Sequence, residues 1–299
     1  MQSAPLDARY RLTGANWPVQ TIADLEMLHD CIKSIRGTAK SLALVPTMGA
    51  LHDGHMALVD EAKRRAGRVI VSIFVNPTQF GPNEDFSSYP RRTEADTAKL
   101  EAAGVDLLWL PDVGTMYPEG HATNVAVAGL SDRLCGAARP GHFDGVATVV
   151  TKLFAQIGPD VAIFGEKDWQ QLAIIRRLVI DLNLPVSIAG VAIQREDDGL
   201  ALSSRNAYLS PDERLAAVAL PRALGAAVKA IIAGKPVEET LNQSAEHMQN
   251  AGFDKVDYVA LVDATTLEPL TMLDREARLL AAARIGKTRL IDNLAVLPR

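Results

Sequence analysis

Two histidines three residues apart, His52 and His55, are side chains that could bind an anion together. They belong to the segment Pro46-Thr47-Met48-Gly49-Ala50-Leu51-His52-Asp53-Gly54-His55, which follows an apolar run and precedes an apolar helical stripe. A helix that begins near His55 would offer free backbone N–H groups and a favourable dipole to a phosphate. The pattern therefore predicts a nucleotide phosphate site. The alternative interpretation is a turn that carries two surface histidines.

Two further segments place polar side chains directly after an apolar run. Asn76 and Gln79 flank Pro77 and could hydrogen-bond a carboxylate or a hydroxyl group. Lys167 supplies a mobile cation, and Asp168 beside it could bind a ribose hydroxyl, a metal ion or a backbone amide. Taken singly, the first segment could be a capping turn and the second a solvated charge run.

A fourth segment, Leu202-Ser203-Ser204-Arg205-Asn206, begins where the texture of the sequence changes. Two hydroxyl groups next to a guanidinium make a good anion clamp, because arginine can form bidentate contacts. Arg139 adds another cation after a loop, and Gln171 lies one helical turn beyond Asp168. The alternative for the clamp is a loop that leads into a helix and carries a surface arginine.

The elements around these segments alternate between strands and helices. We predict strands over 41–46, 68–76, 105–110, 161–165 and 186–193, and helices from residue 21, from about residue 55, and over 93–103, 146–157 and 172–182. This alternation indicates βαβ units with a parallel sheet and right-handed crossovers. Ligands bind beyond the carboxyl ends of the strands in such sheets, where the polar segments above would lie.

The pattern of residues changes after about residue 195 and predicts a second, smaller domain. An Ala-rich helical stretch over 211–234 should bend or break at Pro221, and another helix should follow Pro236. Strands are expected over 255–262, 278–285 and 289–296. We therefore expect a catalytic domain over 1–193, with a loose leader over 1–14, and a small α+β domain over 194–299.

Composition excludes some classes of protein. The chain has 299 residues, 48% of them hydrophobic, and a net charge of −5, which argues against wrapping nucleic acid or an anionic membrane. The two cysteines, Cys31 and Cys135, show no CxxC spacing and suggest a reducing compartment. The start has no secretory-signal pattern, and no apolar run is expected to approach the ~18 residues that span a bilayer. We therefore expect a cytoplasmic protein.

The histidine segment and the distant Leu202-Ser203-Ser204-Arg205 segment resemble the paired HIGH-type and KMSKS-like motifs of the nucleotidylyltransferase superfamily. The full set resembles one member, the pantothenate synthetase (pantoate–β-alanine ligase) family. The motifs that carry this resemblance are PTMGALHDGH, NPTQF, YPR, RPGHFDGV, FGEKDWQQL, LSSRN and, near the end, RLIDN. The resemblance implies an α/β fold: a Rossmann-like parallel-sheet domain followed by a smaller α+β domain that closes over the nucleotide.

The resemblance also implies a reaction. The family condenses pantoate with β-alanine: the pantoate carboxylate attacks the α-phosphate of ATP, and the amine of β-alanine then displaces AMP from pantoyl adenylate. Two alternatives stay open at this point. One is an enzyme of the same fold that transfers a nucleotidyl group to a phosphorylated acceptor, and the other is a non-catalytic nucleotide-sensing module.

Roles carry over from the resemblance residue by residue. His52, His55, Lys167 and Arg205 would be catalytic, with His55 either donating a proton or only stabilising charge. ATP would be bound by Met48, Gly49, Ala50, Leu51, His52, Asp53, Gly54, His55, Gly165, Glu166, Lys167, Asp168, Gln194, Leu202, Ser203, Ser204 and Arg205. Gln79 and Gln171 would hold pantoate, with Asn76 and Arg139 as further contacts.

The remaining implications concern the metal, the assembly and water exclusion. Mg²⁺ would neutralise the triphosphate near Asp96, although Ala95 stands where some members carry a second acid. Cys135 stands where many members have glutamate. The family resemblance implies a homodimer, and segments 80–86 and 119–123 could form gates that exclude water.

Overall fold

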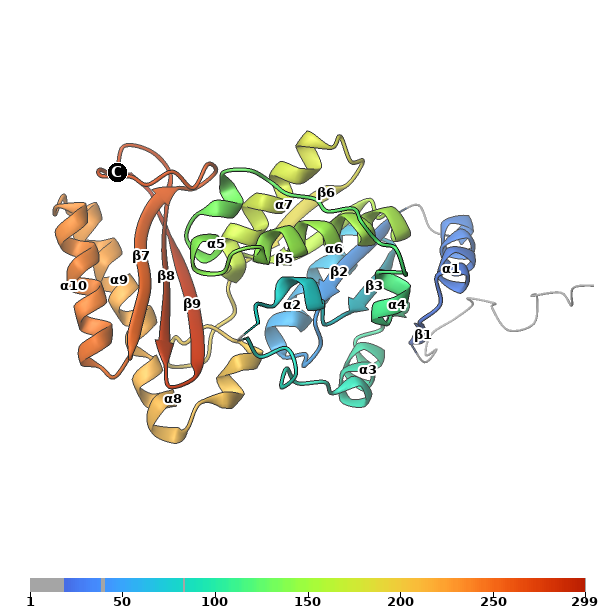
Figure 1. Cartoon of the computed structure of the whole chain (residues 1–299), viewed down its shortest axis with the longest axis horizontal. Coiled ribbons are helices and arrows are strands. Elements are labelled where there is room, and N and C mark those ends of the chain that lie inside the picture. Colours follow the sequence, from blue (N-terminus) through green and yellow to red (C-terminus); the bar gives the residue numbers. More distant parts are fainter. Residues whose placement is uncertain (1–18, 39–40, 83, 299) are drawn as a thin grey trace, which may run out of the picture.

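The computed structural model describes residues 19–38, 41–82 and 84–298, drawn in colour in Figure 1. A larger part contains one parallel sheet, and a smaller part contains one antiparallel sheet (Figure 1). The expected α/β fold with an appended α+β part is therefore confirmed. The expected leader over 1–14 lies outside the described residues.

The parallel sheet has six strands in the order β1-β4-β3-β2-β5-β6. Their bounds are β1 Gln20–Ile22, β2 Leu42–Thr47, β3 Arg68–Ile73, β4 Leu107–Trp109, β5 Val161–Gly165 and β6 Ser187–Val191. Chain order runs outward from β2 in one direction through β3 and β4, and in the other through β5 and β6. The crevice between the ends of β2 and β5 is the topological switch point, where open α/β sheets bind ligands.

Helices cover both faces of this sheet (Figure 1). On one face, α1 Leu25–Thr38, α6 His142–Ile157 and α7 Trp169–Asp181 bury their apolar stripes in one core cluster. On the other, α2 Asp53–Arg65 and α3 Thr93–Ala102 contribute to a second cluster. The short helices α4 Val113–Met116 and α5 Cys135–Ala138 lie in the connection between β4 and α6.

The first helix begins later than the sequence pattern indicates. Gln20–Ile22 form the edge strand β1, paired with β4, and α1 begins only at Leu25. The expectation of a helix from Thr21 was therefore wrong at its start. A three-residue strand is too short to show an alternation of apolar and polar residues, so only the pairing of Ile22 with Trp109 reveals it.

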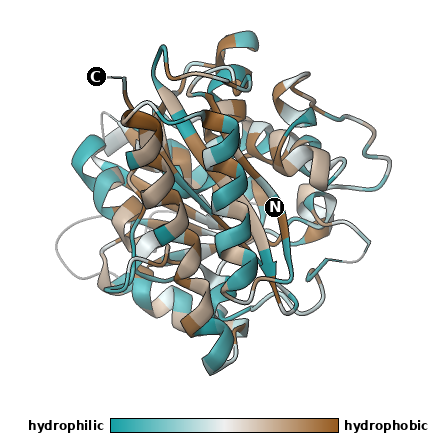
Figure 2. Ribbon diagram, turned by 90° about the vertical axis from the view of Figure 1, so that its left-hand side faces the viewer, coloured by the Kyte–Doolittle hydropathy of each residue, from teal (hydrophilic) through white to brown (hydrophobic). Residues whose placement is uncertain are grey.

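The small sheet consists of β7 Lys255–Asp263, β8 Ala277–Ile285 and β9 Thr288–Val296 in that spatial order. Three helices accompany it: α8 Pro211–Ala217, α9 Ala219–Ile232 and α10 Val237–Asn250. Figure 2 looks at this side, with helices in front and hydrophilic and hydrophobic residues mixed along them. Buried residues of α9, α10 and the three strands share one core cluster.

The helix break in this part does not lie at Pro221. The chain leaves α8 at Val218, and Pro221 is the third residue of α9. A proline in the first turn of a helix loses no hydrogen bond, because the N–H groups there have no partner inside the helix. In a continuous helix the Pro221 ring would clash with the carbonyl group of Ala217, the residue at which α8 ends, so the predicted break is present one turn before the proline.

One apolar stretch is longer than the composition led us to expect. Residues Pro211–Ile232 form a helical segment of 22 residues that is long and apolar enough to cross a bilayer by length and composition alone. The core helix of a soluble protein passes the same test, and Ala219, Leu220, Ala223 and Leu224 pack in the core of the small part. The statement that no apolar run approaches spanning length was therefore too strong.

Side chains of the small part also pack into the large one. Val262, Leu267 and Leu280 belong to the same core cluster as α6 and α7, and the Trp169 indole donates to the Ala264 carbonyl oxygen at 3.0 Å. β9 is the edge strand of the small sheet that faces the large part (Figure 1). The domain boundary after residue 193 stays a prediction.

Candidate active site

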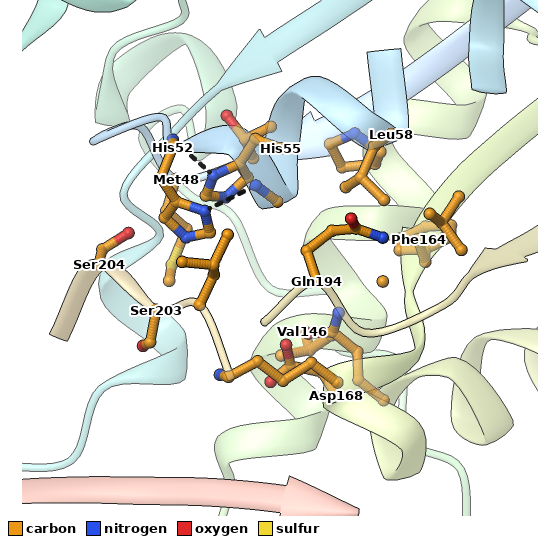
Figure 3. A pocket seen from close by; sticks show the side chains of 18 of the residues that line it. Met48, His52, His55, Leu58, Val146, Phe164, Asp168, Gln194, Ser203 and Ser204 are labelled. Carbon is orange, nitrogen blue, oxygen red and sulfur yellow. Dashed lines mark hydrogen bonds between the residues drawn. The ribbon is translucent and has the colours of Figure 1, made fainter. Parts of the chain in front are cut away.

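The carboxyl ends of β2 and β5 enclose a pocket of about 230 Å³. A wider cleft of about 870 Å³ adjoins it and reaches the small sheet. Lys167, Asp168, Gln171, Ser203 and Arg205 line both spaces. Segments that are more than a hundred residues apart in the sequence therefore meet at the switch point, as Figure 3 shows for His52, Asp168 and Ser203.

His52 and His55 stand side by side at the start of α2, with ring centroids 4.2 Å apart (Figure 3). The Gly54 N–H donates to His52 Nδ1 at 3.1 Å, and the His52 N–H donates to His55 Nδ1 at 3.3 Å. These two hydrogen bonds form a capping box. A neutral ring that accepts at Nδ1 carries its proton on Nε2, so both rings offer an Nε2–H donor.

Both imidazoles are neutral at physiological pH. Burial, followed by the charges of Lys167 and Lys99, lowers the pKa of His52 to about 4. Burial and then the charges of His52, Lys167 and Lys99 lower the pKa of His55 to about 3. At this site the two histidines therefore act as hydrogen-bond donors with an uncharged ring, which favours charge stabilisation over proton donation by a pre-formed imidazolium.

The loop before the histidines is held in an unusual backbone conformation. Gly49 and Ala50 have φ values of 86° and 50°. A Cβ on Gly49 would lie 3.2 Å from Asp96 Oδ2, so glycine is needed here for space as well as for its backbone. The Asp96 carboxylate fixes the loop by accepting the Ala50 N–H at 2.7 Å and the Leu51 N–H at 2.8 Å.

Asp96 does not fit the role of a direct metal ligand. Its side chain is buried, and each oxygen already accepts a backbone N–H. Among residues 19–38, 41–82 and 84–298, no group of three or more His, Cys, Asp and Glu side chains could hold a metal ion. The geometry instead gives Asp96 the role of shaping the loop that carries His52, so the metal assignment requires correction.

Asp96→Asn tests this correction. The new amide N–H₂ would face a backbone N–H, and the lost hydrogen bond should lower the free energy of unfolding by about 1–3 kcal/mol. We expect activity to fall in step, with an unchanged dependence on Mg²⁺ concentration. Urea denaturation and a magnesium titration of the rate measure both quantities. A loss of activity that excess Mg²⁺ restores would show that Asp96 is a metal ligand after all.

Asn76 holds Gln79 in place and has no polar atom left for a substrate. Its Nδ2 donates to Gln79 Oε1 and to the Gly145 carbonyl oxygen, both at 3.1 Å. Its Oδ1 accepts from the Tyr117 hydroxyl at 2.8 Å and from Thr78. Gly145 is required because a Cβ there would lie 2.5 Å from the Thr78 carbonyl oxygen. Asn76 therefore positions Gln79, and its assignment as a substrate contact requires correction.

Arg139 is likewise committed to the protein. Its guanidinium makes two hydrogen bonds to Glu84, at 2.5 and 2.6 Å, and reaches the Gln79 carbonyl oxygen at 3.3 Å. It also lies 3.0 Å from His142 Nε2, while His142 Nδ1 lies 2.8 Å from the Gln79 carbonyl oxygen. Arg139 and His142 thus fix the backbone of Gln79, a role that the sequence analysis did not assign to His142 or to Glu84.

Two cations, Lys167 and Arg205, line the pocket. No hydrogen bond or ion pair engages the ammonium of Lys167 within the described part of the chain. Arg205 pairs with Asp85, Nη2 to Oδ1 at 2.9 Å and Nε to Oδ2 at 3.1 Å. The Ser204 hydroxyl donates to the Ala50 carbonyl oxygen at 3.2 Å, which fastens the clamp segment over the histidine loop.

One wall of the pocket is apolar. Val146, Val149, Val150 and Leu153 of α6 form one wall, and Phe74 and Phe164 at the ends of β3 and β5 add aromatic surface. Gln79 and Gln171 stand beside this wall with amide groups. The chamber therefore suits a small molecule that has a branched aliphatic body and a few polar groups.

The structure brings most of the proposed site residues to one surface. Those that line the pocket are Met48, His52, Gly54, His55, Gln79, Gly165, Lys167, Asp168, Gln171, Gln194, Leu202, Ser203, Ser204 and Arg205. Those that do not are Gly49, Ala50, Leu51, Asp53, Asn76, Asp96, Arg139 and Glu166, although Arg139 lines the wide cleft. The analysis missed Tyr89 and the apolar wall, although the YPR motif and the stripe of α6 were visible signals.

Comparison with known proteins agrees with this geometry. Residues 20–295 match the family described as pantoate-beta-alanine ligase. The chain belongs to this family. It is 61% identical to the pantothenate synthetase of Rhizorhabdus wittichii over 280 residues, which covers 94% of this chain and 99% of the relative. It is 63% identical to that of Sphingopyxis alaskensis over 278 residues, 93% of this chain and all of the relative.

Solved structures of the pantoate–β-alanine ligase family share the fold. The Thermus thermophilus pantothenate synthetase is 48% identical, with a TM-score of 0.88 over 94% of this chain and 100% of that one. The Francisella tularensis ligase, complexed with beta-gamma ATP and β-alanine, is 33% identical, with a TM-score of 0.78 over 92% and 97%. As a member of this ligase family, the chain is an enzyme that forms a carbon–nitrogen bond.

Cys135 is buried at the edge of the wide cleft. Its sulfur lies 3.0 Å from the Tyr258 hydroxyl and 3.5 Å from both terminal nitrogens of Arg289. Arg139, four residues later, forms its ion pair with Glu84. The cysteine is thus a small buried side chain that joins the large part to the small one.

The buried histidines predict a loss of stability in mild acid. The folded protein lowers the pKa of His55 to about 3 and that of His142 to about 4, against 6.5 in the unfolded chain. Stability is complete above pH 6.5 and falls as the pH drops below it, because only the unfolded chain then binds the protons. From about pH 7 to about pH 5, we expect a loss of about 1–2 kcal/mol for each histidine.

Urea denaturation at the two pH values measures this loss, and His142→Gln provides the comparison. The variant lacks one titrating group, so its free energy of unfolding should fall less between the two pH values, whatever its absolute stability. An equal fall in both proteins would contradict the assignment.

Proposed function

We propose that this protein condenses pantoate with β-alanine in two steps and consumes one ATP. In the first step, the pantoate carboxylate attacks the α-phosphate, which gives pantoyl adenylate and pyrophosphate. In the second, the amine of β-alanine attacks the acyl carbon, and AMP leaves. The observation that carries the proposal is the apolar chamber with two glutamines, placed directly beside two histidines and a lysine at the switch point.

Pantoate fits the apolar chamber by its chemistry. Its two methyl groups would contact the α6 wall around Val146 and Val150, and its hydroxyl and carboxylate groups would meet the amides of Gln79 and Gln171. The amide of Gln79 also lies near Met48, with Nε2 3.1 Å from the sulfur. The pre-set orientation of Gln79, fixed by Asn76, would turn the carboxylate toward the phosphate side of the pocket.

ATP would occupy the side of the pocket formed by the histidines and the clamp segment. Attack of a carboxylate on a phosphate brings two anions together, so the barrier depends on cations and hydrogen-bond donors aimed at the phosphate oxygens. The two Nε2–H groups and the Lys167 ammonium are such donors. Gly165, Gln194 and Leu202 would line the nucleotide, and the bridge between Arg195 and Ala201 brings the last two segments together.

The second step needs a dry site. Pantoyl adenylate is a mixed anhydride that water would hydrolyse, and β-alanine must reach it through the wide cleft. Glu84 and Asp85, within the expected gate over 80–86, line that cleft and are held there by ion pairs to Arg139 and Arg205. Residues 119–123, the other expected gate, line neither space.

The apolar chamber also separates this proposal from the nucleotidyltransferase alternative. A phosphorylated acceptor would need cations along the wall of the pocket where Val149, Val150 and Leu153 lie instead. A nucleotide-sensing module would have no use for the chamber. The geometry therefore favours an acceptor with a branched aliphatic body.

Three further properties belong to the proposal. A magnesium requirement would come from the triphosphate of ATP, and we assign no protein ligand to it because Asp96 does not fit. A homodimer follows from the family resemblance, and a cytoplasmic location rests on the cysteine pattern. Sedimentation of the purified protein tests the dimer.

The full reaction tests the proposed function. Purified protein with ATP, Mg²⁺, pantoate and β-alanine should form pantothenate, AMP and pyrophosphate in equal amounts, and omission of pantoate should stop all three. A stable nucleotidyl product in the absence of an amine would contradict the proposal, as would release of ADP.

A further inference from the structure

The RLIDN motif of β9 has no part in the mechanism above, yet its last residue, Asn293, contacts the turn Glu166–Asp168 that carries Lys167, here called the catalytic turn. Asn293 is buried, with 1% of its surface exposed. Its Nδ2 donates to the carbonyl oxygens of Glu166 and Lys167, both at 2.9 Å. We infer that Asn293 is a positioning residue that sets the direction of Lys167 from the small domain; this rests on the proposed role of Lys167 at the phosphates.

Every polar atom of Asn293 has a partner, which fixes its orientation. Oδ1 accepts from Arg278 Nε at 2.6 Å, so the amide cannot flip and Nδ2 must face the turn. The backbone N–H of Asn293 bonds to Asp292 Oδ1 at 2.7 Å. The donor pair on the catalytic turn is therefore set by residues of the small sheet alone.

Arg278 holds the same turn from a second direction. Its Nη2 donates to Glu166 Oε2 at 3.0 Å, and its guanidinium lies 3.8 Å from the centroid of the Trp169 ring. The short 3-10 turn η4 Glu166–Asp168 has no side-chain cap of its own. The side chains that fix this turn are therefore Asn293 and Arg278, both from the small sheet.

The fixed backbone of the turn matters because the Lys167 side chain has no partner of its own among the described residues. Its ammonium has no protein partner in the part of the chain that the structure describes, so only the backbone sets where the side chain starts. An unpaired lysine samples many rotamers, and a backbone that also moved would spread the charge further from the phosphates. Asn293 fixes the carbonyl oxygens of the two peptide bonds that flank the Lys167 Cα, which removes the second source of motion.

Asp292, the residue before Asn293 on β9, binds the segment around Gln194 that we also place beside the nucleotide. Asp292 makes two hydrogen bonds to Arg195, at 2.7 and 2.8 Å, and Arg195 directly follows Gln194. β9 thus contacts both segments that we place around ATP. The small sheet therefore helps to shape both sides of the proposed phosphate site.

A double-mutant cycle tests whether Asn293 acts through Lys167. The rate measured is pantoate-dependent exchange of pyrophosphate into ATP at low ATP concentration, for Asn293→Ala, Lys167→Ala and the double variant. We expect Asn293→Ala to lower the rate about 10- to 100-fold. In the Lys167→Ala background, the same substitution should lower it less than about twofold, because the group it positions is gone.

Two additional variants separate positioning from folding. Asn293→Asp keeps the acceptor for Arg278 but turns an oxygen toward two carbonyl oxygens, so it should lose activity while it remains folded by circular dichroism. Glu268→Gln breaks another contact between the two parts, with Arg133 at 2.6 Å, and should keep full activity.

The outcomes distinguish this inference from the proposed function. If the unsubstituted protein shows no pantoate-dependent exchange, the proposed function fails. If exchange is present but the losses of the two single variants multiply in the double variant, Asn293 does not act through Lys167 and the inference is overturned. Full activity of Asn293→Asp overturns it as well.

Discussion

Replacement of His55 by asparagine is expected to lower the rate of adenylate formation by about 100- to 1,000-fold while the protein stays folded. The side-chain amide of asparagine reaches only as far as Nδ1, so Oδ1 can still accept the His52 N–H and keep the capping box. The Nε2–H donor, which we aim at the transferring phosphate, is lost. Pantoate-dependent exchange of pyrophosphate into ATP measures this step without β-alanine.

His55→Gln is the matched control for this loss. The amide of glutamine reaches the position of Nε2, so it can still donate to a phosphate oxygen although it gives up the capping contact. We expect its exchange rate to lie well above that of His55→Asn. The glutamine amide can donate a hydrogen bond but cannot transfer a proton. An exchange rate of His55→Gln as low as that of His55→Asn would therefore favour proton donation by His55 over charge stabilisation. An unchanged rate in both variants would refute any catalytic role.

Lys167→Ala is the second large effect. Lys167 is the flexible cation between the pocket and the wide cleft, and it lies close enough to lower the pKa of both histidines. Its removal should slow adenylate formation by about 100-fold or more and weaken the binding of ATP, because a charge that faces the phosphates is lost. Exchange rates measured over a range of ATP concentrations separate the two effects.

Two controls accompany this variant. Lys167→Arg keeps the positive charge and should recover part of the rate, although the larger planar head does not match an ammonium. Cys31→Ala, in helix α1, changes a residue that lines neither the pocket nor the wide cleft and should leave the rate unchanged. Normal ATP binding by Lys167→Ala would contradict its placement at the phosphates.

Patterns that are local in the sequence were predictable. The runs around Val45, Val71 and Ile163 are too apolar to be anything but buried strands, and the stripe of α6 shows its period in Val146, Val150 and Leu153. Strand ends then indicated where His52, Lys167 and Gln79 would meet, because parallel strands end at one edge. The resemblance of seven ordered motifs to one ligase family then implied the reaction and the roles of these residues.

Contacts between distant segments were not predictable from such patterns. Asp96 carries the same residue type whether it binds a metal ion or two backbone N–H groups, and only the fold brings Ala50 and Leu51 to it. Arg139 has the charge of a substrate contact, yet Glu84 and His142 occupy its guanidinium. Asn293 lies over a hundred residues from Lys167, and nothing near it in the sequence indicates that partner.

The central claim is that the carboxylate of pantoate attacks the α-phosphate of ATP in this pocket. Pantoate whose carboxylate carries heavy oxygen tests it most directly, with mass spectrometry of the nucleotide after one round of pantothenate formation. The account predicts one heavy oxygen atom in each AMP and none in pyrophosphate, since the bridging oxygen leaves with AMP. Unlabelled AMP, formed at the same rate as pantothenate, would contradict it.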